Sequence, residues 1–139
     1  MTALLNVPLT GLAAGTYQSL PLELQNELTT QFSLQKTFAT ATGGTSCDTY
    51  VQTSFDGGTT WADVVHFAQD ALTATRAVAG VTSVSTAAAP TAATDGAQTV
   101  NTINQGLFGP WWRVKYVLVG SYTSGNLRVD SGGAGLRTP

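Results

Sequence analysis

Alternation of apolar and polar residues is the strongest pattern along this chain. Between Gln18 and Leu24 every second residue is a leucine, and Pro21 places this segment at a sheet edge. From Leu28 to Phe38 the opposite face is uniformly Thr, Gln and Ser. The apolar face of that segment carries Leu28, Phe32, Leu34 and Phe38, interrupted by Thr30 and Lys36. A period of two is what a half-buried strand requires, so we predict strands over both segments.

Glycine pairs divide the middle of the chain into further extended segments. Gly43-Gly44 and Gly57-Gly58 are turn signals, and the runs 48–55 and 61–67 around the second pair predict a hairpin. Further strands are predicted over 76–83, 112–120 and 127–129, with Val114, Tyr116 and Leu118 on the core face of the second. Six to eight short strands with Gly-rich turns predict an all-β fold, an antiparallel β-sandwich or jelly roll.

Three segments lack a strand pattern, within what we interpret as one domain over residues 1–139. Residues 1–15 are predicted to form an N-terminal arm and residues 131–139 a flexible C-terminal tail. Residues 85–106 are rich in Ala, Thr, Asn and Gln and have few large apolar side chains. We predict a long loop or arm there, of a kind that is uncommon in compact domains and often functional.

Composition excludes several classes of partner. Charged residues make up 10% of the chain, against about 25% in typical domains, and the net charge is −2. The six Lys and Arg residues are scattered, so nucleic acid is not an expected partner. The longest apolar run, around residues 117–119, is too short to cross a bilayer, and the N-terminus lacks the positive region of a signal peptide. We therefore expect a soluble protein made in a cytoplasm, with no membrane partner.

Few residues of the sequence are candidates for catalysis or metal binding. His66 is the only histidine and Cys47 the only cysteine, so neither a disulfide within the chain nor a zinc site can be assembled. A Cys47–His66 pair across a hairpin is conceivable, but an inert thiol and a packed histidine are the simpler interpretation. We expect no catalytic residues, no metal and no cofactor, and the chain is not predicted to be an enzyme.

One short motif has a defined structural meaning. Residues 54–61 match the Asp-box pattern Ser-x-Asp-x-Gly-x-Thr-Trp at Ser54, Asp56, Gly58, Thr60 and Trp61. The aspartate can accept backbone hydrogen bonds in the turn, the glycines permit positive φ, and the tryptophan can cover the turn. The motif resembles the Asp-box hairpins on sialidase blades, which are structural, so the resemblance implies a stable hairpin and no catalytic role.

Two longer segments resemble proteins of another kind. Residues 48–64 and 113–129 are similar to segments found in small virion proteins of tailed bacteriophages. The resemblance implies a non-enzymatic structural protein located in the virion. The first choice is a capsid decoration or cement protein that binds the major capsid protein, and the alternative is a neck or tail component. It also implies a homo-oligomer, with a trimer as the working guess.

Aromatic residues near the end of the long loop are the candidate interface. Phe108 and Trp111 precede the clearest core strand and Trp112 begins it, and adjacent strand residues point to opposite faces. At most one of the two tryptophans should therefore enter the core, and the other could contact a neighbouring protein or lie flat on its own sheet. An exposed Trp61, Trp111 or Trp112 could instead stack on a sugar ring, which makes a carbohydrate-binding, lectin-like module the other alternative function.

Overall fold

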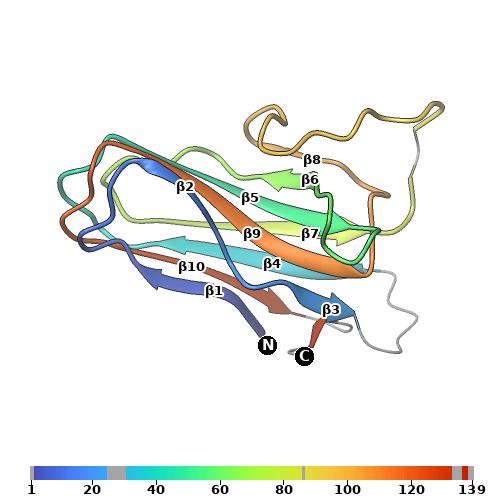
Figure 1. The fold of residues 1–139 in the computed structure, drawn as a ribbon, viewed down its shortest axis with the longest axis horizontal. Coiled ribbons are helices and arrows are strands. Elements are labelled where there is room, and N and C mark those ends of the chain that lie inside the picture. Colours follow the sequence, from blue (N-terminus) through green and yellow to red (C-terminus); the bar gives the residue numbers. More distant parts are fainter. Residues whose placement is uncertain (1, 25–30, 86, 133–135, 138–139) are drawn as a thin grey trace.

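The computed structural model describes residues 2–24, 31–85, 87–132 and 136–137, and it consists of two antiparallel sheets packed face to face (Figure 1). The first sheet has the order β1-β10-β4-β7. Its strands are β1 (Thr2–Pro8), β10 (Asn126–Gly132), β4 (Gln31–Phe38) and β7 (Thr75–Thr82). The predicted all-β sandwich is confirmed, and the described residues include no helix that could span a membrane.

The second sheet is larger and has the order β11-β3-β9-β5-β6-β8, with β2 also paired to β9. Its strands are β2 (Gly15–Gln18), β3 (Leu22–Leu24), β5 (Ser46–Ser54), β6 (Ala62–His66), β8 (Thr102–Ile103), β9 (Trp111–Val119) and β11 (Leu136–Arg137). The described residues thus form eleven strands, more than the six to eight predicted. The count was too low partly because β8 and β11 have only two residues each, too few for alternation to show.

The hydrophobic core lies between the sheets and follows the predicted alternation. On β4, Phe32, Leu34 and Phe38 are buried, and on β9 so are Trp112 and every second residue after it. The rings of Phe32 and Trp112 meet edge to face with their centroids 4.9 Å apart. The long antiparallel register between β5 and β9 holds the centre of the second sheet together.

A buried ion pair crosses this core. Lys36 lies on the apolar face of β4 and is 1% exposed, and its ammonium group contacts the carboxylate of Asp70 and donates to the carbonyl of Ala68 at 3.2 Å. The backbone of Asp70 is paired with Cys47 on β5 through two hydrogen bonds of 2.8 and 3.0 Å. The interruption at Lys36 in the sequence pattern is therefore a polar link from the first sheet to the second.

Three sequence predictions about chain ends and edges need correction. The predicted arm over residues 1–15 is wrong for Thr2–Pro8, which pair with β10, because the Leu and Val side chains there reach the core. The leucine stripe predicted over 18–24 breaks between β2 and β3, where Leu20 is 85% exposed. The predicted flexible tail 131–139 lies partly outside the described residues, and its described part includes the end of β10 and β11, which pairs with β3.

Replacing Lys36 tests the link between the sheets. We expect Lys36→Met to lower the free energy of unfolding by about 3–5 kcal/mol, because it leaves the Asp70 carboxylate buried without a counter-charge. Denaturation in urea measures the loss. The double variant Lys36→Met/Asp70→Asn removes both charges and should recover part of it. A loss of under about 1 kcal/mol for the single variant would mean that the pair behaves as a solvated surface pair.

Candidate functional site

The turn between β5 and β6 has the hydrogen bonds that the Asp-box residues predict. The Asp56 carboxylate accepts from the Thr60 backbone N–H at 2.8 Å and from the Ser54 hydroxyl at 2.8 Å. Gly57 and Gly58 have φ angles of 72° and 92°. These lie in the left-handed region, where a residue with a side chain would be strained. Hydrogen bonds from Thr60, and then from Ser54, lower the pKa of Asp56 to about 2.

Trp61 closes the same turn and joins it to the neighbouring sheet surface. Its indole N–H donates to the Gly58 carbonyl at 3.0 Å, and the side chain is buried. The Arg113 guanidinium lies over the Trp61 ring, 4.4 Å from its centroid, a cation–π contact. The Asp box is thus a packed structural turn whose tryptophan is covered by a strand residue.

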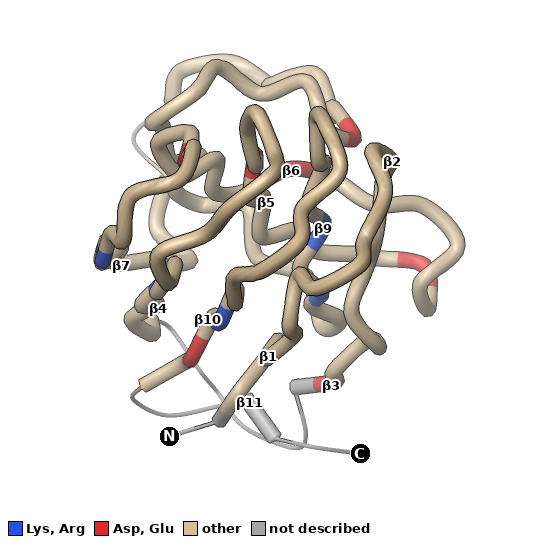
Figure 2. Tube along the Cα trace, turned by 90° about the vertical axis from the view of Figure 1, so that its left-hand side faces the viewer, with Lys and Arg blue, Asp and Glu red and all other residues tan. Residues whose placement is uncertain are grey.

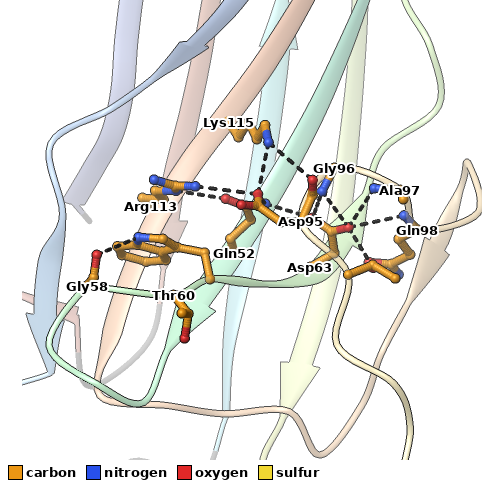
Figure 3. A network of polar contacts seen from close by, with 12 residues as sticks. Gln52, Gly58, Thr60, Asp63, Asp95, Gly96, Ala97, Gln98, Arg113 and Lys115 are labelled. Atoms are coloured by element: carbon orange, nitrogen blue, oxygen red, sulfur yellow. Dashed lines mark hydrogen bonds and ion pairs between the residues drawn. The ribbon is translucent and has the colours of Figure 1, made fainter.

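A polar layer lies on the outer face of the second sheet, beyond the core (Figure 3). Gln52 on β5 is opposite Arg113 on β9, Tyr50 is opposite Lys115, and the residue of β6 paired with Gln52 is Asp63. Polar side chains on the solvent face of a sheet are ordinary, but Gln52 and Asp63 are 0% and 1% exposed. They are buried because the segment 94–98 of the long loop covers them.

Asp63 holds that loop segment in place. One or both of its carboxylate oxygens accept from the backbone N–H groups of Gly96 at 2.8 Å, Ala97 at 2.9 Å and Gln98 at 3.1 Å. They also accept from the Thr94 hydroxyl and the Gln52 amide, both at 2.8 Å. Burial alone would raise the pKa of Asp63, but these hydrogen bonds outweigh it and lower the pKa. The long loop is therefore not an arm over this stretch, and what the sequence pattern did not reveal is that a buried carboxylate anchors it.

Asp95 ties the tip of the same segment to β9. Its carboxylate accepts from Gln52 at 2.6 Å and from Lys115 at 2.9 Å, and the Arg113 Nε donates to the Gln52 side-chain oxygen at 2.7 Å. Burial opposes ionisation of Asp95, but hydrogen bonds from Lys115 and Gln52 and the nearby positive charges lower its pKa. Lys115 and Arg113 of β9 both reach the Asp95 carboxylate of the loop, at 2.9 and 3.5 Å.

His66 makes the third contact between the sheet and the loop. Its Nε2 lies 2.9 Å from the Asp48 carboxylate, its Nδ1 lies 2.8 Å from the Gln98 carbonyl oxygen, and Tyr50 stacks on the ring at 4.0 Å. Both ring nitrogens lie within hydrogen-bond distance of an oxygen atom. This accounts for His66 as a packed, hydrogen-bonded residue.

The one cysteine of the sequence is not an exposed nucleophile. Burial raises the pKa of the Cys47 thiol to about 12, which keeps it in the unreactive protonated form, and its side chain lies in the core and not beside His66. Within the described part of the chain, no three His, Cys, Asp or Glu side chains gather into a cluster that could hold a metal ion. The carboxylates and cations of the polar layer are engaged with one another and with the loop.

The three candidate interface aromatics do not share one surface. Trp112 is fully buried, and Phe108 is partly buried and packs against it with the ring centroids 5.1 Å apart. The interface prediction is therefore wrong for Trp112, because its ring fills the core between the sheets. Trp111 points to the outer face, as the adjacent-residue argument predicts for one of the pair, and is partly exposed.

Comparison with known proteins found no family model, no curated protein and no solved structure that matches this chain. The class that the structure defines is an all-β sandwich with a polar layer that anchors a long loop over one sheet.

Acidification tests the role of Asp63. Because its folded-state pKa is lowered, its contribution to stability is fully present above the unfolded value of about 3.9 and is lost as the pH falls through the folded value. We expect Asp63→Asn to lower the free energy of unfolding by about 2 kcal/mol at neutral pH. Between neutral pH and about pH 3, the free energy of unfolding should then fall less than it does in the unsubstituted chain. Urea denaturation across this pH range measures both effects.

Glu23→Gln is the matched control, since Glu23 is a partly exposed carboxyl on β3. It should leave the pH dependence as in the unsubstituted chain. Equal behaviour of Asp63→Asn and Glu23→Gln would contradict the anchoring role of Asp63.

Proposed function

We propose that this chain is a non-enzymatic structural protein of a tailed-bacteriophage virion, and that it acts as a capsid decoration protein that binds the lattice of the major capsid protein. A neck or tail position is the alternative within the same class. The proposal is carried by the resemblance of residues 48–64 and 113–129 to segments of small phage virion proteins.

The positions of these two segments support treating them as one unit. Residues 48–64 cover most of β5, the Asp-box turn and the start of β6, while residues 113–129 include most of β9. The strands β5 and β9 are neighbours paired from Ser46↔Val119 to Ser54↔Trp111. Most of the resemblance therefore falls on adjacent strands of the second sheet, which is what a shared scaffold would preserve, and residues 126–129 continue it into β10 of the first sheet.

The use of polar groups also favours a binding role over a catalytic one. The charges of the polar layer bind the long loop, and Lys36 and Asp70 bind the two sheets together. The exposed surface offers isolated apolar side chains, among them Leu20, which is 85% exposed, and Phe55, which is 62% exposed. A protein whose function is assembly needs a rigid framework and such contact points, and few long-range charges that would repel neighbouring copies.

Binding to the virion is the direct test. The purified chain should co-sediment with cognate capsids that lack it, saturably and at a fixed ratio to the capsid subunit. We expect Trp111→Ala to weaken binding by about tenfold or more, since a partly exposed tryptophan is a favoured interface residue. Val119→Ala, on the same face of β9 at the opposite end, is the control and should bind normally.

The two variants and the unsubstituted chain separate the outcomes. Equal binding of both variants would show that Trp111 is not part of the interface. Absence of binding to the cognate capsid, neck and tail would contradict the proposed function itself.

A lectin-like module is the second candidate, favoured only by the partly exposed Trp111. Of the three tryptophans, Trp61 and Trp112 are buried and are poorly placed to stack on a sugar. We therefore expect no saturable signal on a glycan array. Binding to a glycan that Trp111→Ala abolishes, while Val119→Ala retains it, would favour the carbohydrate-binding function instead.

A further inference from the structure

The strand β7 forms a free edge of the first sheet. It pairs with β4 along its whole length, from Gln31↔Thr82 to Phe38↔Thr75, and within the described part of the chain no strand lies on its other side. In Figure 2, β7 lies at the left-hand margin of the molecule, with β4 next to it. An eight-residue edge with unpaired backbone groups is a template for another strand.

The long loop already closes one end of this edge. The side-chain amide of Gln105 accepts from the Thr82 N–H at 2.7 Å and donates to the Gly80 carbonyl at 2.7 Å. The Gly106 N–H donates to the Thr82 carbonyl at 2.9 Å. These contacts replace the hydrogen bonds that a neighbouring strand would make, and they identify which peptide groups of β7 point outward.

Because backbone groups alternate in direction along an antiparallel strand, the outward residues are Arg76, Val78, Gly80 and Thr82. The loop covers Thr82 and the Gly80 carbonyl, so the open stretch runs from Arg76 to Gly80. Val78 is at its centre and is 74% exposed. Arg76 is the one charged residue on this stretch.

We propose that β7 pairs with β7 of a second copy of this chain, antiparallel and about a twofold axis through Val78. In this register Val78 faces Val78 as a hydrogen-bonded pair, and the Gly80 N–H of each copy donates to the Arg76 carbonyl of the other, while the Gly80 carbonyl keeps its hydrogen bond from Gln105. The two four-stranded sheets then become one continuous sheet across the dimer. This inference goes beyond the proposed function and does not rest on it.

Three observations favour a second copy over a different protein. The open groups from the Arg76 carbonyl to the Gly80 N–H are symmetric about Val78, so self-pairing joins them two by two and stops at the Gly80 carbonyl, which Gln105 caps. Opposite each Arg76 lies Gly80, where an added Cβ would meet nothing within 4 Å, so the outer side of the sheet has room for the arginine side chain. The two Arg76 residues stand about 13 Å apart, four residues along a strand, which avoids a like-charge contact.

The side chains that face inward also suit this pairing. On that side Ala77 of one copy faces Ala79 of the other, and both are small. They flank a hollow of about 290 Å³ between β7 and β8, which is also lined by Phe67 and Ile103. A second β7 would cover part of the mouth of this hollow, and removal of apolar surface from water would add to the hydrogen bonds.

Sedimentation of the full chain over a range of concentrations tests the dimer. We expect a species of twice the 14.4 kDa chain mass that dissociates on dilution. Val78→Pro removes an N–H that points away from β4, so the fold should tolerate it while the dimer is lost. Val84→Pro, at a valine that is 68% exposed and lies beyond the end of β7, should leave the dimer intact.

Cysteine cross-linking tests the register. Val78→Cys should form disulfide-linked dimers on mild oxidation, because residues on the twofold axis face each other, whereas Val84→Cys should not. Three results would overturn the proposal: a chain that remains a monomer at millimolar concentration, a dimer that survives Val78→Pro, or protection of the Val78 amide from exchange only when a different protein is added. Capsid binding by a monomer would leave the proposed function standing while this inference fails.

Discussion

The hydrogen bonds that Asp63 accepts from the loop determine which surfaces this protein can present. A carboxylate that is 1% exposed must have its charge satisfied, and three successive backbone N–H groups at Gly96, Ala97 and Gln98 do so. With that segment in place, β5 and β6 are covered on both faces. The loop therefore forms a third layer on the outer face of the second sheet. Surfaces that the loop does not cover remain available for partners.

The same principle acts inside the core, where Lys36 and Asp70 connect the two sheets. Buried charges are costly unless they are paired, and this protein pairs them between segments far apart in the chain. Each polar link thus ties together elements that the apolar core alone would hold less specifically. The result is a sandwich whose sheets and long loop are joined by paired charges, in a chain with only 10% charged residues.

How far the sequence predicts the candidate site depends on the range of the interactions involved. The Asp-box turn could be predicted because Ser54, Asp56 and Thr60 bond within a few residues of one another. The layer around Asp63 and Asp95 could not, because its partners lie 11 to 43 residues away along the chain. A signal did exist, since Arg113 and Lys115 alternate with apolar residues on a predicted strand, but it marks only an outer face.

By itself the sequence determined the all-β class, the core faces of the main strands and the Asp-box hairpin, because alternation and turn chemistry are local properties of the chain. Only the tertiary structure decided that Thr2–Pro8 form a strand, that the loop over residues 94–98 packs on the sheet, and that Trp112 is buried while Trp111 is partly exposed. These outcomes depend on which distant strands become neighbours and on which buried charges find partners. Neither can be predicted from the spacing of residues along one segment.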